Sequence, residues 1–138
     1  MSEKIAVGTR YEHEFRFSQD DVVAFANLTG DHNPIHLDAE YAATTKFKTP
    51  IIHGHLSSSV FTRFLGMGEP GGPGSIYMKQ ETEYLRPMYV DTDYVVVFEV
   101  AEVDPVRHIA KISTQIKNKE TGKVTIRGIG TLMNETHY

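Results

Sequence analysis

The fold is decided by residues 52–65, which read IHGHLSSSVFTRFL. Apolar side chains recur there at spacings of three and four, which predicts a helix with one wide apolar face. These side chains are Ile52, Leu56, Val60, Phe61, Phe64 and Leu65. Three consecutive serines, Ser57 to Ser59, have middling helix propensity, but small side chains let a sheet approach a helix closely. We therefore predict a buried central helix at residues 53–66.

The segments around this helix have the composition of strands, because they are rich in Val, Ile, Thr and aromatic residues or alternate apolar with polar side chains. The predicted strands are residues 9–17, 75–86, 94–103, 108–118 and 124–134. Short connections favour antiparallel pairing in a meander. Gly128 and Gly130 alternate on one face of the last strand, which predicts a close neighbour, and the central helix is the expected one. Residues 66–74, rich in Gly and Pro, predict a long surface loop.

Two short helices are expected before the central helix. Ser18 and Asp21 resemble a capping box that opens the first, and Gly30 supplies its end. Asp38 is a suitable cap for the second, which would run to Ala43. Between them, the turn-forming residues around Pro34 predict a loop, because proline disfavours helical angles in the residue before it.

The composition indicates a single domain spanning 1–138. A chain of 138 residues can bury one cooperative core. With 14 basic and 18 acidic side chains the net charge is −4, which argues against nucleic-acid and membrane partners. The absence of cysteine excludes a disulfide framework, thiolate metal sites and a cysteine nucleophile. A cytoplasmic protein is expected, since neither a signal peptide nor a transmembrane run is recognisable.

Three apparent motifs lack the context that their chemistry needs. Residues 66–71 match a dinucleotide fingerprint, but here a helix precedes it instead of a strand. His32 and His36 have the spacing of a helical metal pair, yet Pro34 lies between them. The serines of the central helix have no Gly-x-Ser-x-Gly elbow. We therefore predict no metal and no cofactor.

Asp31 and His36 are the candidates for acid–base chemistry. They place a carboxylate and an imidazole five residues apart in a loop braced by Asn33 and Pro34, so both side chains can point into one pocket. The alternative is that Asp31 only makes a turn and that His36 is a half-buried spacer. Spacing alone does not exclude that alternative.

The order Gly-Asp-x-Asn-Pro-x-His, residues 30–36, followed by the small residue Ala42, resembles the signature of the MaoC-like family of (R)-specific, or type-2, enoyl-CoA hydratases. A second block, residues 50–56, resembles the start of that family's central helix. The resemblance implies an α+β hot-dog domain, in which an antiparallel sheet wraps a long central helix. It also implies a lyase of fatty-acid metabolism, a homodimer and active sites near the dimer interface.

The implied reaction is the reversible syn hydration of trans-2-enoyl-CoA to (R)-3-hydroxyacyl-CoA. By resemblance Asp31 and His36 are both catalytic and hold the attacking water, and which one takes its proton stays open. Gly54 is the implied backbone donor to the thioester oxygen, because helix N–H groups favour negative charge. The alternative for Gly54 is that it merely starts the helix.

Asn33, Thr62 and Leu65 are the candidate substrate-binding residues. Asn33 is expected to orient the catalytic loop, while Thr62 and Leu65 fall where family members line the acyl pocket. Ordinary core contacts are the alternative for the last two. Other functions remain open: a (3R)-hydroxyacyl-ACP dehydratase, a hot-dog acyl-CoA thioesterase, and a non-catalytic acyl-CoA-binding protein. The partner is thus an acyl-CoA or acyl carrier protein thioester.

Overall fold

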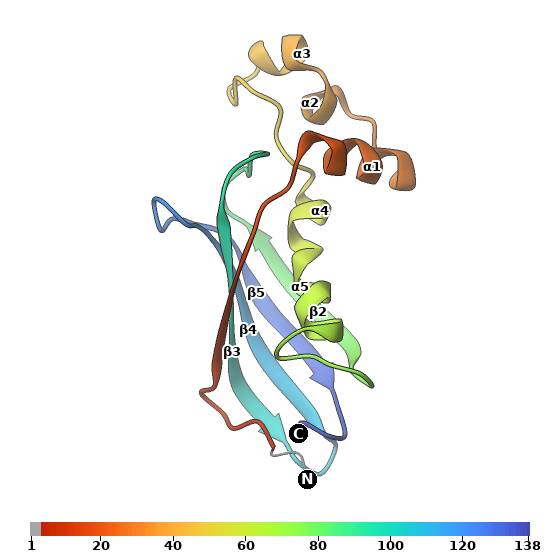
Figure 1. Ribbon diagram of the computed structural model, residues 1–138, viewed down its shortest axis with the longest axis vertical. Helices are drawn as coiled ribbons and strands as arrows, with labels where there is room; N and C mark the ends of the chain where they lie inside the picture. The colour runs from red at the N-terminus through yellow and green to blue at the C-terminus, as the bar shows by residue number, and fades with distance from the viewer. Residues whose placement is uncertain (1–3) are drawn as a thin grey trace.

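The computed structural model describes residues 4–138, which form a five-stranded antiparallel sheet curved around a helix (Figure 1). The strands are β1 (Arg10–Phe15), β2 (Ile76–Tyr84), β3 (Tyr94–Asp104), β4 (Ile109–Asn118) and β5 (Val124–Met133). Their order across the sheet is β1-β3-β4-β5-β2. The five predicted strands and their antiparallel pairing are confirmed, and the arrangement is the α+β hot-dog fold.

The helix inside the sheet is the predicted central helix. It consists of α4 (Gly54–Ser58), α5 (Val60–Thr62) and the π-helical turn η1 (Arg63–Met67). These follow one another without a break, since Ser59 has right-handed helical dihedral angles. The buried side chains are Leu56, Ser57, Val60, Phe61, Phe64 and Leu65. Thr62 and Arg63 are exposed, so the central helix is buried along one side and not all round.

One feature of the topology differs from the predicted meander. β3, β4 and β5 do follow one another across the sheet, but β2 pairs with β5 and not with β3, which follows it in the chain. Residues 85–93 therefore cross one end of the sheet. Within the described residues, β2 pairs on one side only, and its other side is a sheet edge.

Close packing explains the glycines of β5 and of the loop after the central helix. A Cβ on Gly128 would overlap the carbonyl oxygen of Glu81 in β2, whereas one on Gly130 would lie 3.0 Å from Leu65 of the central helix. The central helix is thus the close neighbour of Gly130, whereas Gly128 packs against β2. The predicted surface loop is wrong in part, since residues 70–72 are buried and a Cβ on Gly71 would collide with the backbone of Leu65.

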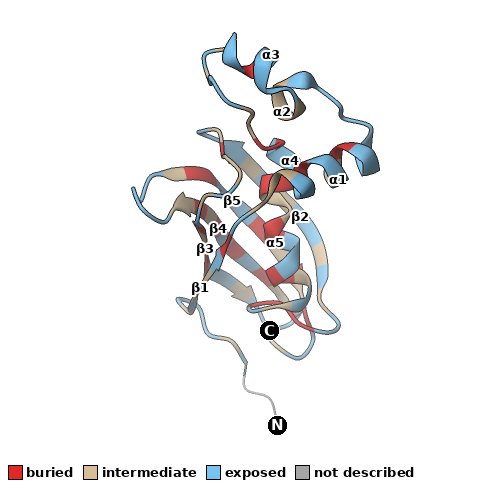
Figure 2. Ribbon diagram, turned by 45° about the horizontal axis from the view of Figure 1, so that its top comes forward, coloured by how far each residue is buried: buried red, intermediate tan, exposed pale blue. Residues whose placement is uncertain are grey.

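Three short helices lie beyond one end of the sheet, in a segment that we call the overhang, residues 18–50 (Figures 1 and 2). They are α1 (Gln19–Thr29), α2 (Pro34–Leu37) and α3 (Ala39–Ala43). The capping box of Ser18 and Asp21, the left-handed Gly30 and the Asp38 cap are confirmed. Helix α2 was not predicted; Pro34 begins it, because the first helical position needs no N–H. No helix formed by residues 4–138 combines the length and apolar character that crossing a membrane requires.

Candidate active site

The overhang meets the central helix at Asp31, His36 and His53. One side-chain nitrogen or oxygen of each lies within 4.8 Å of those of the other two. Asp31 follows α1, His36 belongs to α2, and His53 immediately precedes α4. The fold therefore brings the predicted pair Asp31 and His36 together, and it adds a third polar side chain that the sequence did not single out.

The hydrogen bonds of His36 determine which of its nitrogens is available. Its Nδ1 lies 2.7 Å from the carbonyl oxygen of Ile51, which can only accept a hydrogen bond. Nδ1 thus carries the proton in the neutral ring, and Nε2 keeps its lone pair. The side-chain amide of Gln19 also donates to the main-chain carbonyl of His36, at 3.1 Å. These contacts give a partly buried imidazole with one basic nitrogen.

Asp31 and Asn33 shape the loop between α1 and α2. The Asn33 N–H donates to Asp31 Oδ1 at 3.3 Å, and Asn33 Oδ1 accepts from the Ile35 N–H at 3.1 Å as the cap of α2. Both side chains are exposed. The Asn33 side chain therefore orders the loop, and it lines neither of the two cavities described below.

Gly54 is the first residue of the central helix and directly follows His53 in the chain. His53, at the N-cap, makes no side-chain hydrogen bond to the first helical turn. Gly54 lines a cavity of about 350 Å³ together with Ile51 and Arg86. A Cβ on Gly54 would lie 3.0 Å from the Tyr84 ring, so this ring packs against the glycine.

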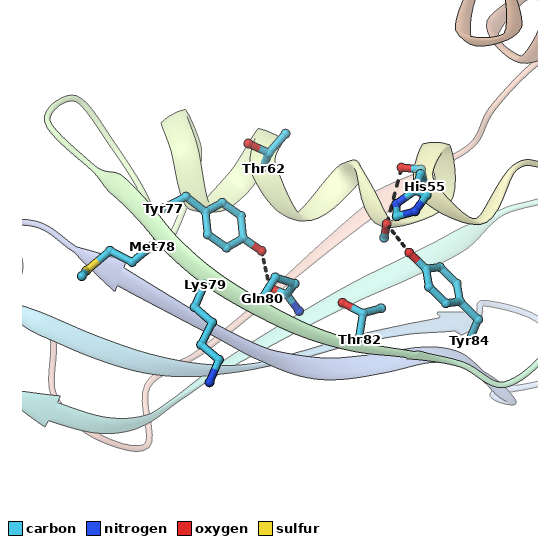
Figure 3. Close-up of a pocket in the computed structure, with 9 residues that line it drawn as sticks. His55, Thr62, Tyr77, Met78, Lys79, Gln80, Thr82 and Tyr84 are labelled. Atoms are coloured by element: carbon cyan, nitrogen blue, oxygen red, sulfur yellow. Dashed lines mark hydrogen bonds between the residues drawn. The ribbon is translucent and has the colours of Figure 1, made fainter. Parts of the chain in front are cut away.

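A second cavity, of about 590 Å³, lies between the central helix and β2 (Figure 3). Thr62 lines it, and Tyr84 lines both cavities. The Tyr84 and Ser58 hydroxyls form a hydrogen bond of 2.9 Å across it. Deeper in this cavity the Tyr77 hydroxyl donates to the Gln80 side chain, and burial raises the pKa of Tyr77 to about 12.

Leu65 lies elsewhere. It is fully buried in the core and lines neither cavity. Gly130 lies between Leu65 and the larger cavity. A Cβ on Gly130 would contact both Leu65 and Gln80, and Gln80 lines that cavity. The structure thus separates Thr62, at the cavity surface, from Leu65, beneath it.

The stacking of His36 on His53 is unfavourable for joint coordination of one metal ion by the two rings. The two ring centroids are 3.9 Å apart and the planes differ by 28°. Imidazole lone pairs lie in the ring plane, so nearly parallel rings do not direct them at one point, as a tetrahedral ion would require.

Among residues 3–124 the chain matches the family described as MaoC like domain. It belongs to the MaoC-like family. This MaoC-like chain is 38% identical over 115 residues to the (R)-specific enoyl-CoA hydratase of Aeromonas caviae, a match that covers 83% of the chain and 85% of that protein. It is 35% identical over 116 residues to the (R)-specific enoyl-CoA hydratase of Rhodospirillum rubrum, covering 84% and 78%.

Solved structures agree with this assignment. The (R)-hydratase of A. caviae superposes with a TM-score of 0.88 at 35% identity, covering 96% of this chain and 98% of that one. The R-hydratase of Pseudomonas aeruginosa gives 0.86 at 36% identity, covering 94% and 81%. The predicted MaoC-like hot-dog fold is confirmed.

Sequence reasoning missed His53 and Tyr84. His53 lies in residues 50–56, directly before Gly54. The only feature of the sequence that could have pointed to it was its position just before a predicted helix. Tyr84 carried no signal, because its position against Gly54 depends on β2 lying beside the central helix.

Proposed function

We propose that this MaoC-like protein is an (R)-specific enoyl-CoA hydratase, which adds water reversibly and syn across trans-2-enoyl-CoA to give (R)-3-hydroxyacyl-CoA. The observation that carries the proposal is the convergence of Asp31 and His36 next to Gly54 at the start of the central helix. The 38% identity with the A. caviae hydratase supports the same activity.

Asp31 and His36 activate the water. The Asp31 carboxylate and the free Nε2 of His36 each accept a hydrogen bond, so together they hold one water molecule by its two O–H groups. As the water oxygen bonds to the β-carbon, one O–H proton passes to this pair, and the pair returns a proton to the α-carbon. Neither step needs a cofactor, since the pair supplies and receives the proton.

Gly54 stabilises the charge that this attack creates. Electron density moves onto the thioester oxygen as the enolate forms, and the N–H of Gly54 at the start of the helix is suited to donate to it. Loss of one such donor typically costs on the order of a hundredfold or more in rate. The missing side chain lets the Tyr84 ring pack against Gly54, beside the smaller cavity that both residues line.

The two cavities that share Tyr84 are assigned to the substrate, although Asp31 and His36 line neither of them and Gly54 is the proposed catalytic residue that lines the smaller one. Thr62 contacts the acyl group in the larger one, Leu65 acts only through core packing behind it, and Asn33 acts through the loop geometry. The smaller cavity carries Lys46 and Arg86, whose charges suit the phosphates of CoA.

The functional unit is proposed to be a cytoplasmic homodimer of single domains, each spanning residues 1–138. The support is the exposed edge of β2, which carries the exposed apolar side chains Ile76 and Met78. Unpaired edges bearing apolar residues favour pairing with another strand. Sedimentation of the purified chain tests the dimer, and Met78→Glu should shift the measured mass toward that of a monomer.

Crotonyl-CoA hydration tests the activity. The purified protein should remove the enoyl absorbance, and chiral analysis should find the (R)-product. Asp31→Ala and His36→Ala should both abolish the loss of absorbance. His32→Ala is the matched control, because this exposed imidazole bonds to Asn27 and Gly30 within the same segment but not to the pair. Full activity in both Asp31 and His36 variants would contradict the assignment.

A (3R)-hydroxyacyl-ACP dehydratase is the second candidate. The chain is 29% identical over 134 residues to a mitochondrial 3-hydroxyacyl-[acyl-carrier-protein] dehydratase of Solanum lycopersicum. Faster turnover of a carrier-protein substrate than of the matched CoA ester would favour it. Release of free thiol would indicate a thioesterase, and binding of CoA esters without turnover a non-catalytic protein.

A further inference from the structure

His53 touches both members of the proposed catalytic pair without belonging to it. Its side chain is almost completely buried, with 2% of its surface exposed. Its Nε2 lies 3.0 Å from the main-chain carbonyl oxygen of Asp31, so Nε2–H donates to it. One face of the ring stacks on His36, and the Phe25 ring lies 4.9 Å from it.

These contacts are part of a short set of links between residues 31–36 and 51–53. The Ile51 N–H donates to the Ile35 carbonyl at 3.1 Å, and His36 Nδ1–H donates to the Ile51 carbonyl at 2.7 Å. Both links fix the α2 end of the loop. Of the three, only the bond from His53 reaches Asp31, so it is the one that ties the main chain of Asp31 to the start of the central helix.

The other nitrogen of His53 shows that the imidazole is not there for packing alone. Because Nε2 carries the proton, Nδ1 is an acceptor, and it is buried without a hydrogen-bond partner among the described residues. A buried polar atom without a partner is destabilising. An apolar ring of the same shape would avoid that penalty, and the only favourable polar contact that an apolar ring would lose is the bond to Asp31.

We propose that His53 is a positioning residue for hydration. Its hydrogen bond fixes the main chain of Asp31, its ring face fixes the plane of His36, and its own backbone leads directly into Gly54. It thereby aligns the carboxylate, the basic Nε2 and the backbone N–H on one substrate, while its own nitrogens exchange no proton with that substrate. This inference rests on the proposed hydratase function.

Two substitutions separate the hydrogen bond from the ring. His53→Phe keeps an aromatic face and removes the donor, whereas His53→Gln places an amide N–H near the position of Nε2. With crotonyl-CoA, His53→Phe should lower kcat by about tenfold to a hundredfold, because small misplacements of catalytic groups have effects of that size. KM and the urea midpoint should stay near the wild-type values. His53→Gln should recover a large part of kcat, and His32→Phe, in the same loop, should match the wild type.

The outcomes are distinct. A wild-type kcat in His53→Phe, or a His53→Gln variant no better than His53→Phe, would overturn the positioning role while leaving the hydratase intact. Inactive wild-type protein would overturn the hydratase and this inference with it. If neither variant folds, imidazole ¹⁵N–¹H spectra of the wild type decide the question. They should show His53 protonated at Nε2 and His36 at Nδ1, and a proton on His53 Nδ1 in place of Nε2 would contradict the proposal.

Discussion

The overhang and the helix-in-sheet body are held together by different forces. In α1, α2 and α3 the buried side chains are only Val22, Ala26 and Ala42, whereas most of the apolar residues of the central helix and of β3 are buried (Figure 2). In the overhang only Val22 belongs to the core cluster, with Phe25 and Leu37 packed against it, and caps and hydrogen bonds to residues 51–53 add to these contacts. The difference teaches that most of the stability resides in the body, whereas the proposed acid–base pair Asp31 and His36 resides in the overhang. Substitutions in the two parts should therefore affect different measurements.

Asp31→Asn should have the largest effect of the substitutions considered in this comparison, and only on activity. The amide keeps the shape of the side chain but cannot take a proton, so kcat for crotonyl-CoA should fall by roughly a hundredfold to ten-thousandfold. The urea midpoint should not change, because the carboxylate is exposed and bonds only within its own loop. Asp20→Asn, an exposed carboxylate in α1, is the control for both measurements. A marked drop in midpoint for Asp31→Asn would break the proposed separation.

Phe98→Ala should have the next largest effect, on stability. Phe98 of β3 is fully buried and packs edge-on against Phe61 of the central helix. Removing such a ring typically costs about 3–5 kcal/mol in the free energy of unfolding, which urea titration measures. The molecules that remain folded should keep a wild-type kcat. Phe98→Leu, which leaves a smaller cavity, should lose less stability, and an equal loss would contradict the packing argument.

High pH should weaken the body through the partly buried phenol of Tyr77 and the buried phenol of Tyr138. Burial raises the pKa of Tyr77 and of Tyr138 from 10.0 to about 12. Because the folded state holds these protons more tightly than the unfolded state, their contribution to stability is complete below pH 10. It is lost as the pH rises toward 12. Urea midpoints and tyrosinate absorbance across this range measure the effect.

Tyr138→Phe should make that decline shallower. The Tyr138 hydroxyl is buried without a hydrogen-bond partner among the described residues, so its removal breaks no bond and removes a group that must stay protonated. An unchanged decline in the variant would show that Tyr138 does not contribute to it.

The two parts also differed in how well the sequence predicted them. Apolar periodicity located the central helix within one residue at each end, because apolar residues spaced three and four apart lie on one face of a helix and can be buried together. In the overhang, capping chemistry located α1 and α3, since caps are local interactions. The local spacing of Asp31 and His36 made them candidates, and the resemblance of residues 30–36 to the MaoC-like signature identified them as the expected catalytic pair.

What the sequence could not predict depends on contacts between distant segments. The pairing of β2 with β5 places Tyr84 against Gly54, and no local pattern encodes that choice of partner. The two contacts of His53 likewise need the overhang to fold back over residues 51–53. Residues 70–72 seemed typical of a surface loop, yet the missing side chain of Gly71 lets them pack against the central helix.

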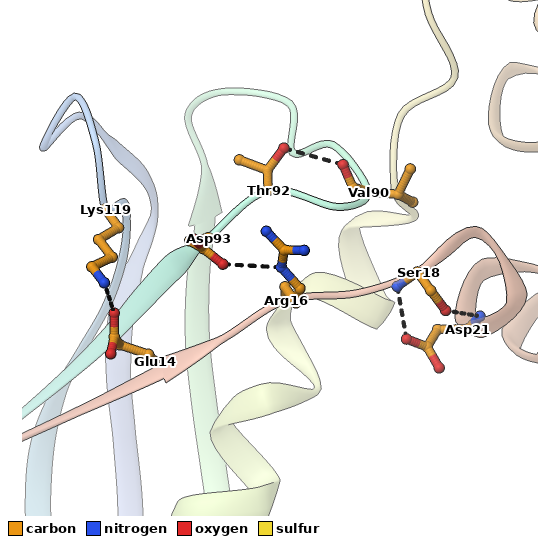
Figure 4. Close-up of polar contacts among 8 residues, drawn as sticks. All are labelled: Glu14, Arg16, Ser18, Asp21, Val90, Thr92, Asp93 and Lys119. Atoms are coloured by element: carbon orange, nitrogen blue, oxygen red, sulfur yellow. Dashed lines mark hydrogen bonds and ion pairs between the residues drawn. The ribbon is translucent and has the colours of Figure 1, made fainter.

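Ser18→Ala should have the smallest effect, and it tests the separation most directly. Ser18 lies where β1 leads into α1; its Oγ accepts the Asp21 N–H at 3.2 Å, and Asp21 Oδ2 accepts the Ser18 N–H at 2.8 Å (Figure 4). Loss of such a cap typically costs about 1 kcal/mol.

That cost should be confined to the overhang. Amide hydrogen exchange should speed up in α1 while the exchange of β3 and β4 and the global urea midpoint stay unchanged, because a weakly packed segment can open without the core. Arg16→Ala removes the neighbouring exposed ion pair with Asp93, at 3.0 Å, and serves as the control, since such pairs contribute little. If the Ser18 variant instead lowered protection evenly through β3, the overhang and the body would unfold as one unit. The catalytic loop would then share the stability of the core, and the contrast between the two parts would be wrong.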